Sequence, residues 1–182
     1  MLYTIYNDIH KFAPHEMKVD YIFGETVIYN GDIVDIGACA YSELPEANRF
    51  LLDLIEKAKC NFTSGNHEKM MEYPFVVKDK ILFTHGDLVF KDITAARNFR
   101  WGREGSGWFR RLYVRAGSYL RHFLKKNNGI SDNDMTEAIE WAKRHKCHTI
   151  VCGHKHPKEI LKRTKDGVTL IILPRGINII NI

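Results

Sequence analysis

The chain has 182 residues, 45% of them hydrophobic, which is enough to bury the core of one domain without disulfides or structural metals. Its 27 basic and 22 acidic side chains give a net charge of +5, which favours an anionic partner without identifying it. We find no secretory signal, no apolar stretch long enough to span a bilayer, and four cysteines without a CxxC pair: Cys39, Cys60, Cys147 and Cys152. We therefore expect one cytoplasmic domain over residues 1–182, with no transmembrane segment and with reduced thiols.

In the first half of the chain, short apolar runs bounded by polar residues or glycine predict strands over residues 2–6 and 25–29. Apolar side chains at helical spacing predict a helix over residues 45–59, with a proline suited to its first turn. A strand over residues 60–63 and a hairpin over residues 75–84 follow. The first half therefore alternates strands with a helix.

In the second half, Ser131 and Asp134 indicate the start of a helix that runs to about Lys146, and a strand follows over residues 148–152. The last apolar runs are separated by two turns, which predicts an antiparallel meander over residues 159–180. Alternating strands and helices early in the chain, and hairpins late, imply mixed strands covered by helices.

Five polar motifs each follow an apolar or β-branched run directly, and together they can build a two-metal site. They are Asp8-Ile9-His10, Gly31-Asp32-Ile33-Val34-Asp35, Gly65-Asn66-His67-Glu68, Thr84-His85-Gly86-Asp87 and Gly153-His154-Lys155-His156. A single motif of this kind is explained by a turn or by an ordinary surface histidine. Five in order favour a shared site, because hydrolysis of a phosphoester needs positive charge, an activated nucleophile and leaving-group stabilisation, which two metals supply.

The expected metal ligands combine carboxylate, imidazole and amide oxygen without a thiolate: Asp8, His10, Asp32, Asn66, His85, His154 and His156. At a strand end, side chains two residues apart point the same way, so Asp8 and His10 would reach one metal. Asp32, which follows a glycine, is the expected bridging carboxylate. This donor set suits two divalent ions, with Mn as our first choice and Fe, Zn, Ni or Co as alternatives.

In this order the motifs resemble the signature of the calcineurin-like metallophosphoesterases, DxH, GDxxD, GNH[D/E], H and GHxH, over residues 8–156. The resemblance implies an α/β (α+β) fold, a four-layer αββα sandwich of two mixed β-sheets with helices outside. It also implies that two metals share Asp32. One metal would be held with Asp8, His10 and His156, and the other with Asn66, His85 and His154.

The resemblance further implies a metal-dependent phosphoric ester hydrolase, in which a metal-bound hydroxide attacks phosphorus in line. The bond would be a phosphodiester, a phosphomonoester or a pyrophosphate. His67 would be the general acid that protonates the leaving oxygen, and Asp35 would orient its imidazole. Glu68 and Asp87 adjoin the motifs, and we expect them to support the site rather than to bind metal.

Basic charge is concentrated between the fourth and fifth motifs, in an insertion over about residues 91–127. Residues 91–126 carry ten Lys or Arg against two acidic residues, so the rest of the chain is net negative. Residues 109–126 separate into an apolar and a basic arc on a helical wheel, which predicts an amphipathic helix. Five arginines are candidates for substrate binding, because a guanidinium fork fits a phosphate: Arg97, Arg100, Arg103, Arg111 and Arg115.

Three roles remain open for this helical insertion. It could pack as an ordinary surface helix, cap the active site and grip an anionic substrate, or contact an anionic membrane. Its position resembles that of the insertion in UDP-2,3-diacylglucosamine pyrophosphatases, so nucleotide, nucleic-acid and lipid-linked phosphates are all candidate substrates. The alternative to an enzyme is a nucleic-acid or membrane-surface binding protein that works through the basic helix and keeps a vestigial phosphatase site. The sequence leaves the oligomeric state open.

Overall fold

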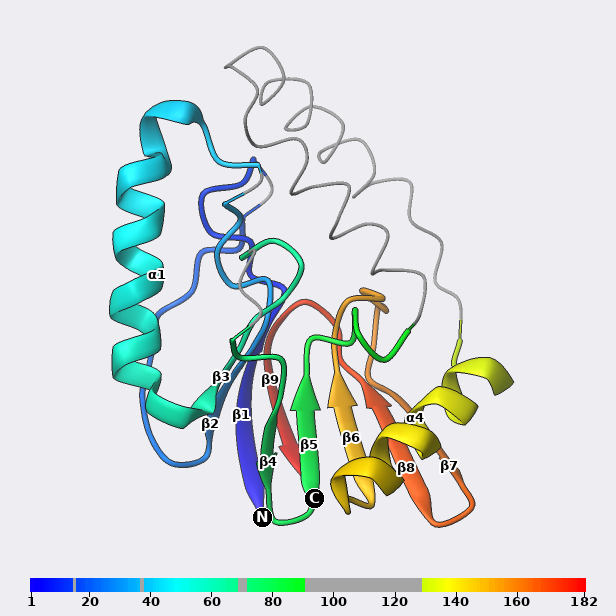
Figure 1. Ribbon diagram of the computed structural model, residues 1–182. Coiled ribbons are helices and arrows are strands. Elements are labelled where there is room, and N and C mark those ends of the chain that lie inside the picture. Colours follow the sequence, from blue (N-terminus) through cyan, green and yellow to red (C-terminus); the bar gives the residue numbers. More distant parts are fainter. Residues whose placement is uncertain (15, 37, 69–71, 91–128) are drawn as a thin grey trace.

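The computed structural model describes residues 1–14, 16–36, 38–68, 72–90 and 129–182 (Figure 1). Its strands form two mixed sheets, one with four strands in the order β3-β2-β1-β9 and one with five in the order β4-β5-β6-β8-β7. The strands are β1 (Leu2–Asn7), β2 (Val27–Asn30), β3 (Phe62–Thr63), β4 (Val76–Lys78), β5 (Ile81–Thr84), β6 (Thr149–Cys152), β7 (Leu161–Lys165), β8 (Val168–Ile172) and β9 (Gly176–Asn181).

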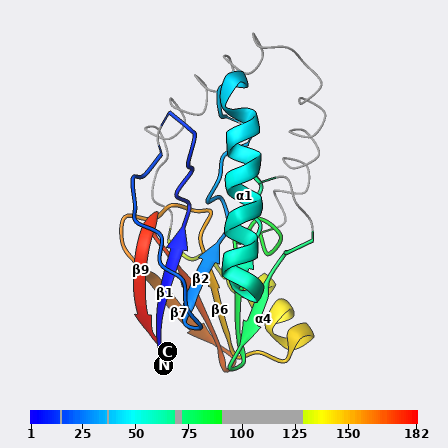
Figure 2. The ribbon, with the colours of Figure 1, turned by 90° about the vertical axis from the view of Figure 1, so that its left-hand side faces the viewer.

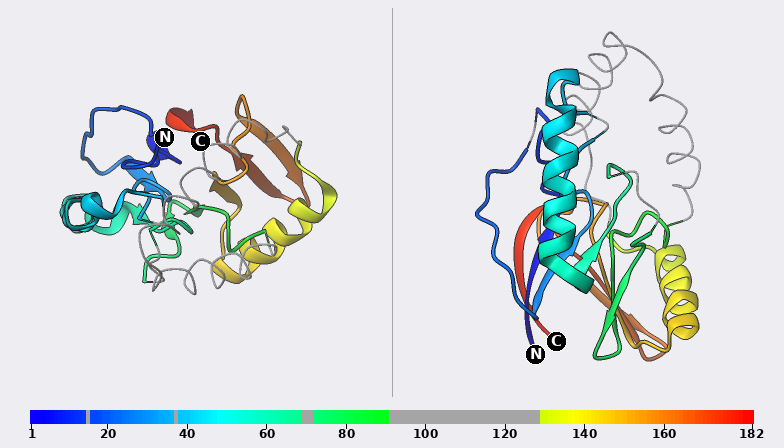
Figure 3. Two further views of the ribbon diagram at one scale, coloured as in Figure 1. Left: turned by 90° about the horizontal axis from the view of Figure 1, so that it is seen from above. Right: turned by 60° about the vertical axis from the view of Figure 1, so that its left-hand side comes forward.

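Each sheet is covered on its outer face by one long helix. Helix α1 (Leu44–Ala58) buries Leu51 and Leu54 in an apolar cluster with residues of β1, β2 and β3. Helix α4 (Asp132–His145) buries Met135 and Ala138 in a second cluster with β5, β6 and β8. Short 3-10 turns, η1 (Tyr41–Glu43) and η2 (Lys59–Asn61), flank α1. Seen from above, the four layers lie side by side, which confirms the expected αββα sandwich (Figure 3).

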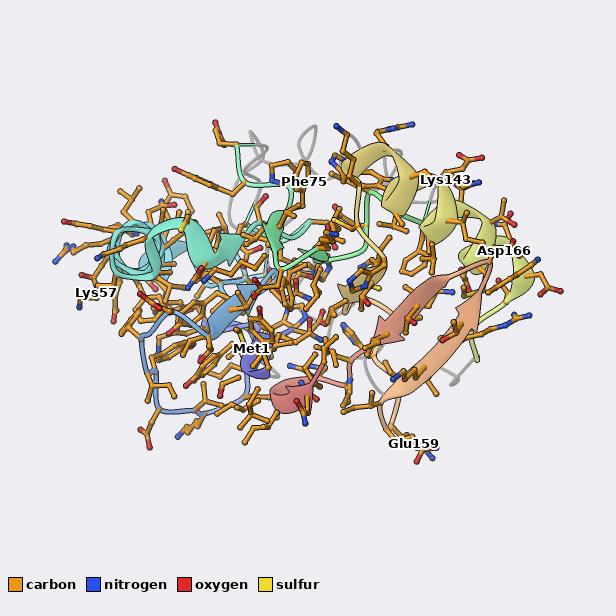
Figure 4. The ribbon with its side chains drawn as sticks, turned by 90° about the horizontal axis from the view of Figure 1, so that it is seen from below. Met1, Lys57, Phe75, Lys143, Glu159 and Asp166 are labelled. Carbon is orange, nitrogen blue, oxygen red and sulfur yellow. The ribbon has the colours of Figure 1, made fainter. Side chains whose placement is uncertain are left out.

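The inner faces of the two sheets share a third apolar cluster. Tyr3 and Ile5 of β1 pack with Phe83 of β5 and Val151 of β6, and the rings of Tyr3 and Phe83 lie 5.1 Å apart between centroids. Seen from the end that carries Met1, side chains fill the space between the sheets (Figure 4). Because successive strand residues face opposite sides, β1 contributes to this cluster and, through Tyr6, to the cluster under α1.

Two predicted elements differ from the observed ones. The strand predicted over residues 60–63 is reduced to β3, because residues 59–61 form the turn η2. The predicted meander is wrong at its last step: β7 and β8 pair antiparallel, but β9 crosses to the other sheet and pairs antiparallel with β1 (Figure 2). Periodicity predicted these strands correctly but contains no information on their partners.

The motif loops leave the sheets at one common edge. β1 and β2 run parallel, as do β5 and β6, so the carboxyl ends of both pairs point toward the top of Figure 1. The predicted basic insertion over residues 91–127 lies outside the described residues. Neither α1 nor α4 has the length and apolar composition that a bilayer-crossing helix requires.

Candidate metal centre

The expected ligands come together at the common edge, each on a loop that follows a strand. Asp8 and His10 follow β1, Asp32 follows β2, and Asn66 follows β3. His85 follows β5 directly. His154 and His156 lie on the loop after β6, so both sheets contribute to the site.

Their donor atoms form three overlapping clusters that could each hold a metal ion. Within a cluster all ligand atoms lie within 4.8 Å of one another. The clusters are Asp8, His10 and His156; Asp8, Asp32 and His85; and His10, Asp32 and His67. Asp8, His10 and Asp32 each belong to two of them, so the groups merge into one centre.

Asp32 lies in the middle of this centre. Its Oδ2 atom is 3.3 Å from Nε2 of His85, 3.6 Å from Nε2 of His67 and 3.9 Å from Nε2 of His10. The other carboxylate oxygen, Oδ1, accepts a hydrogen bond of 2.8 Å from the backbone N–H of His67. One oxygen therefore faces three imidazoles from three loops.

The remaining ligands make two sets of close contacts, and Asp8 and His85 link the two sets, with Oδ1 of Asp8 3.9 Å from Nδ1 of His85. Oδ1 of Asp8 lies 2.8 Å from Nε2 of His156 and 3.8 Å from Nε2 of His10. In the other set, Nε2 of His85 lies 3.1 Å from Oδ1 of Asn66 and 3.0 Å from Nδ1 of His154. The cluster of Asp8, Asp32 and His85 joins members of both groups that the resemblance implies, so the assignment of each ligand to one metal stays a prediction.

The backbone brings the ligands together differently from the strand alternation expected above. Five of them have positive φ angles, from 46° to 63°, a region that non-glycine residues seldom adopt: Asp8, His10, Asp32, His154 and His156. Backbone hydrogen bonds hold the first two loops together, including His10 N–H to the Asp32 carbonyl at 2.8 Å. Strained backbone of this kind is typical of sites that the surrounding fold keeps in place.

A divalent cation fits the chemistry of these residues. Burial alone would raise the pKa of Asp8, but the imidazoles of His156 and His85 hold it well below its usual range. The buried Nδ1 of His85 has no hydrogen-bond partner within the described ranges and lies 3.9 Å from Oδ1 of Asp8. Buried carboxylates, imidazoles and an amide oxygen together form a donor set for a transition metal.

Asp35 contacts two imidazoles with the same oxygen. Its Oδ2 lies 2.6 Å from Nδ1 of His67 and 3.2 Å from Nδ1 of His10. Burial would raise the pKa of Asp35, but His67 and His10 lower it well below its usual range, so the group is a carboxylate. Burial lowers the pKa of His10 to about 4, although Asp35 acts in the opposite direction. The imidazole of His10 is therefore neutral at pH 7, which is the form that binds a metal.

Glu68 joins two of the motif loops. The oxygens of its buried carboxyl group accept hydrogen bonds from the backbone N–H groups of Asp32 (2.8 Å), Val34 (3.0 Å) and Gly65 (2.7 Å). Burial and the charge of Asp32 raise its pKa to about 8, while the bonds from Val34 and Gly65 act in the opposite direction. These contacts agree with the supporting role expected for Glu68.

Sequence inspection missed several residues that fix Asp8. The amide of Asn7 donates to Oδ2 of Asp8 at 2.7 Å and accepts from the amide of Asn30 at 3.2 Å. Nε of Arg175 donates to the Asp8 carbonyl at 2.9 Å from the turn between β8 and β9. The one available signal was an asparagine at the end of each of two buried strands.

Two motif glycines are explained by close approach. A Cβ atom at Gly65 would overlap the carboxylate of Asp32, and one at Gly153 would overlap the side chains of Asn7 and Asp8. The five candidate substrate arginines lie outside the described residues: Arg97, Arg100, Arg103, Arg111 and Arg115.

The fold is an αββα sandwich whose clustered His and Asp residues could bind metal. The sequence matches the calcineurin-like phosphoesterase family over residues 1–158, and the chain belongs to that family. A search of curated proteins gives no match to this chain. Family membership implies a phosphate-containing substrate, and the buried His and Asp clusters are where divalent metals could bind.

Proposed function

We propose that the protein is a dinuclear-metal-dependent phosphoesterase that hydrolyses a phosphodiester, phosphomonoester or pyrophosphate bond. The observation that carries the proposal is the position of Asp32, whose Oδ2 faces His85, His67 and His10 at 3.3–3.9 Å. Of these imidazoles, His85 and His10 belong to the two different proposed ligand groups, so a carboxylate between them could serve both metals.

The metal ligands in this proposal form two groups that share Asp32. Asp8, His10 and His156 would complete one group, and Asn66, His85 and His154 the other. Two divalent ions bound there, with Mn as first choice, would offset phosphate charge and lower the pKa of water.

His67 is the proposed general acid and Asp35 its positioning partner. The contact of 2.6 Å between His67 Nδ1 and Asp35 Oδ2 orients the ring. The opposite atom, Nε2, is then directed toward the centre, 3.6 Å from Oδ2 of Asp32. From there Nε2 of His67 can donate its proton to the leaving oxygen.

The proposed substrate is an anionic nucleotide, nucleic-acid or lipid-linked phosphate in the cytoplasm. Its charge would be met by basic residues of the insertion: Arg97, Arg100, Arg103, Arg111 and Arg115. The rival role, binding through the basic helix with a vestigial site, has less support. A relic would be expected to have lost ligands, yet all seven expected ligands are present in the chain.

The decisive experiment compares the wild type with Asp32→Asn. We expect the wild type to bind two Mn per chain and to hydrolyse bis-p-nitrophenyl phosphate. Asp32→Asn should lose bound metal. Its turnover should fall by more than roughly 10–100-fold, which is the usual loss when a residue hydrogen-bonded to a metal ligand is removed. Asp53→Asn, on the exposed face of α1, is the matched control. Unchanged metal content and turnover in Asp32→Asn would refute the proposal.

A further inference from the structure

Lys155 lies between two of the expected ligands but its side chain makes other contacts. It occupies the loop after β6, between His154 and His156, whose φ angles are 63° and 46°. This left-handed backbone is unfavourable for residues with a side chain, so contacts elsewhere must stabilise it. One such contact is a hydrogen bond of 3.0 Å, which the backbone N–H of His154 donates to Oδ2 of Asp8.

The ammonium group of Lys155 makes two further contacts. Its Nζ lies 2.5 Å from Oδ2 of Asp134 and 4.6 Å from the ring centroid of Phe90. The side chain of Asp134 is 8% exposed and that of Lys155 25% exposed, so solvent screens this ion pair only in part. Asp134 is itself fixed, because it accepts a hydrogen bond of 2.8 Å from the backbone N–H of Ser131.

The two partners of Lys155, Phe90 and Asp134, lie on either side of the basic insertion in the sequence. Phe90 immediately precedes residues 91–128, and Ser131 begins the capping box of α4 shortly after them. Phe90 and Ile130 belong to the same apolar cluster as Cys152, the last residue of β6. Lys155 therefore joins the metal-ligand loop to the two described ends of the insertion.

We propose that Lys155 is a positioning residue that holds His154 and His156 in place for metal binding through its contacts with Asp134 and Phe90. The inference rests on the proposed function and adds a residue to it. Because its charge is paired with Asp134, we assign Lys155 a positioning role and not a contact with the substrate. Breaking the ion pair from either side should therefore have the same effect on metal affinity.

The test uses Lys155→Met, Asp134→Asn, their double variant and Lys155→Arg in the full chain. Ser131 N–H and Lys155 Nζ contact the same oxygen, Oδ2 of Asp134, so Asp134→Asn removes the charge of the pair while its amide oxygen keeps the bond from Ser131. Lys158→Met, an exposed lysine of the same loop, is the matched control. Mn affinity is measured by calorimetry, and kcat and KM are measured with bis-p-nitrophenyl phosphate at several Mn concentrations.

We expect each single variant to weaken Mn binding by about tenfold or more, which is the usual effect of losing a residue behind metal ligands. The double variant should be no worse than either single one, because both remove the same charge–charge interaction. Excess Mn should restore kcat with unchanged KM, Lys155→Arg should retain affinity, and Lys158→Met should match the wild type.

Two results would overturn the inference. One is unchanged Mn affinity in both Asp134→Asn and Lys155→Met. The other is a raised KM in Lys155→Met alone, which would place its charge on the substrate. If Lys155→Met does not fold, Asp134→Asn and Lys155→Arg still decide. If the wild type binds Mn without hydrolysing any ester, the proposed function fails while the affinity data still test Lys155.

Discussion

At the scale of single residues, Asp35 is shared by a metal ligand and the proposed general acid. Its Oδ2 contacts Nδ1 of both His10 and His67, and the two rings lie 4.6 Å apart between centroids in an edge-on arrangement. Asp35 is itself fixed by the backbone N–H of Ala38, which donates to Oδ1 at 2.8 Å. A carboxylate behind a ligating histidine fixes the tautomer and the ring orientation.

The role of His67 can be separated from metal binding. We expect His67→Ala to keep its metals and to lose about 10²–10⁴-fold in kcat for esters with poor leaving groups. The loss should be small for p-nitrophenyl esters, because p-nitrophenolate leaves without protonation. The measurement is the slope of log kcat against leaving-group pKa, with metal content determined in parallel. An unchanged slope would contradict the acid role, and His145→Ala on α4 is the control.

At the scale of elements, α4 begins with a complete capping box. Ser131 Oγ accepts from the backbone N–H of Asp134 at 3.2 Å, and the Asp134 carboxylate accepts from the backbone N–H of Ser131. Two backbone donors that the first turn leaves unpaired are thereby satisfied. Since Asp134 also pairs with Lys155, the same helix end that stabilises α4 contacts the metal-ligand loop.

These two roles of the helix start should separate on mutation. Ser131→Ala removes one cap bond and should lower the free energy of unfolding by about 1 kcal/mol. Mn affinity should stay at the wild-type level, because the Asp134 carboxylate keeps its bond from the Ser131 backbone. Chemical denaturation and calorimetry measure the two quantities. Ser42→Ala, at an exposed position without a capping bond, is the control. Equal stability of the two variants would contradict the capping role.

At the scale of the whole molecule, the metal centre connects the two sheets. Asp8 and Asp32 extend from the four-stranded sheet, whereas His85, His154 and His156 extend from the five-stranded one. Without metal, this edge places buried carboxylates and imidazoles close together. Metal binding should therefore stabilise the contact between the layers as well as the individual loops.

Removal of metal is expected to lower the melting temperature. A ligand at 1,000 times its dissociation constant stabilises the folded state by about 4 kcal/mol. For a chain of this size that corresponds to roughly 10 °C. Thermal unfolding in EDTA and after addition of Mn measures the shift in melting temperature. Asp32→Asn should show only a small difference between the two conditions. Identical melting temperatures for the wild type in EDTA and Mn would contradict the metal centre.

The sequence by itself determined what depends on local chemistry. Apolar periodicity predicted both long helices and most strands, and the capping residues predicted the start of α4 at Ser131. The five motifs predicted a set of ligand types, and all of the predicted ligands lie at one edge of the fold. The helices and strands were predicted correctly because helix caps and strand ends are properties of neighbouring residues, while the metal-binding role of the ligands stays a prediction.

Only the tertiary structure decided the contacts between distant residues. The transfer of β9 to the sheet of β1, the sharing of Asp35 by two histidines and the pairing of Lys155 with Asp134 are all invisible in the sequence pattern. The left-handed backbone of the ligands is equally hidden, because local preference opposes it. Burial and long-range packing set these features, since many strand partners satisfy the same periodicity but only one arrangement buries both sheets against each other.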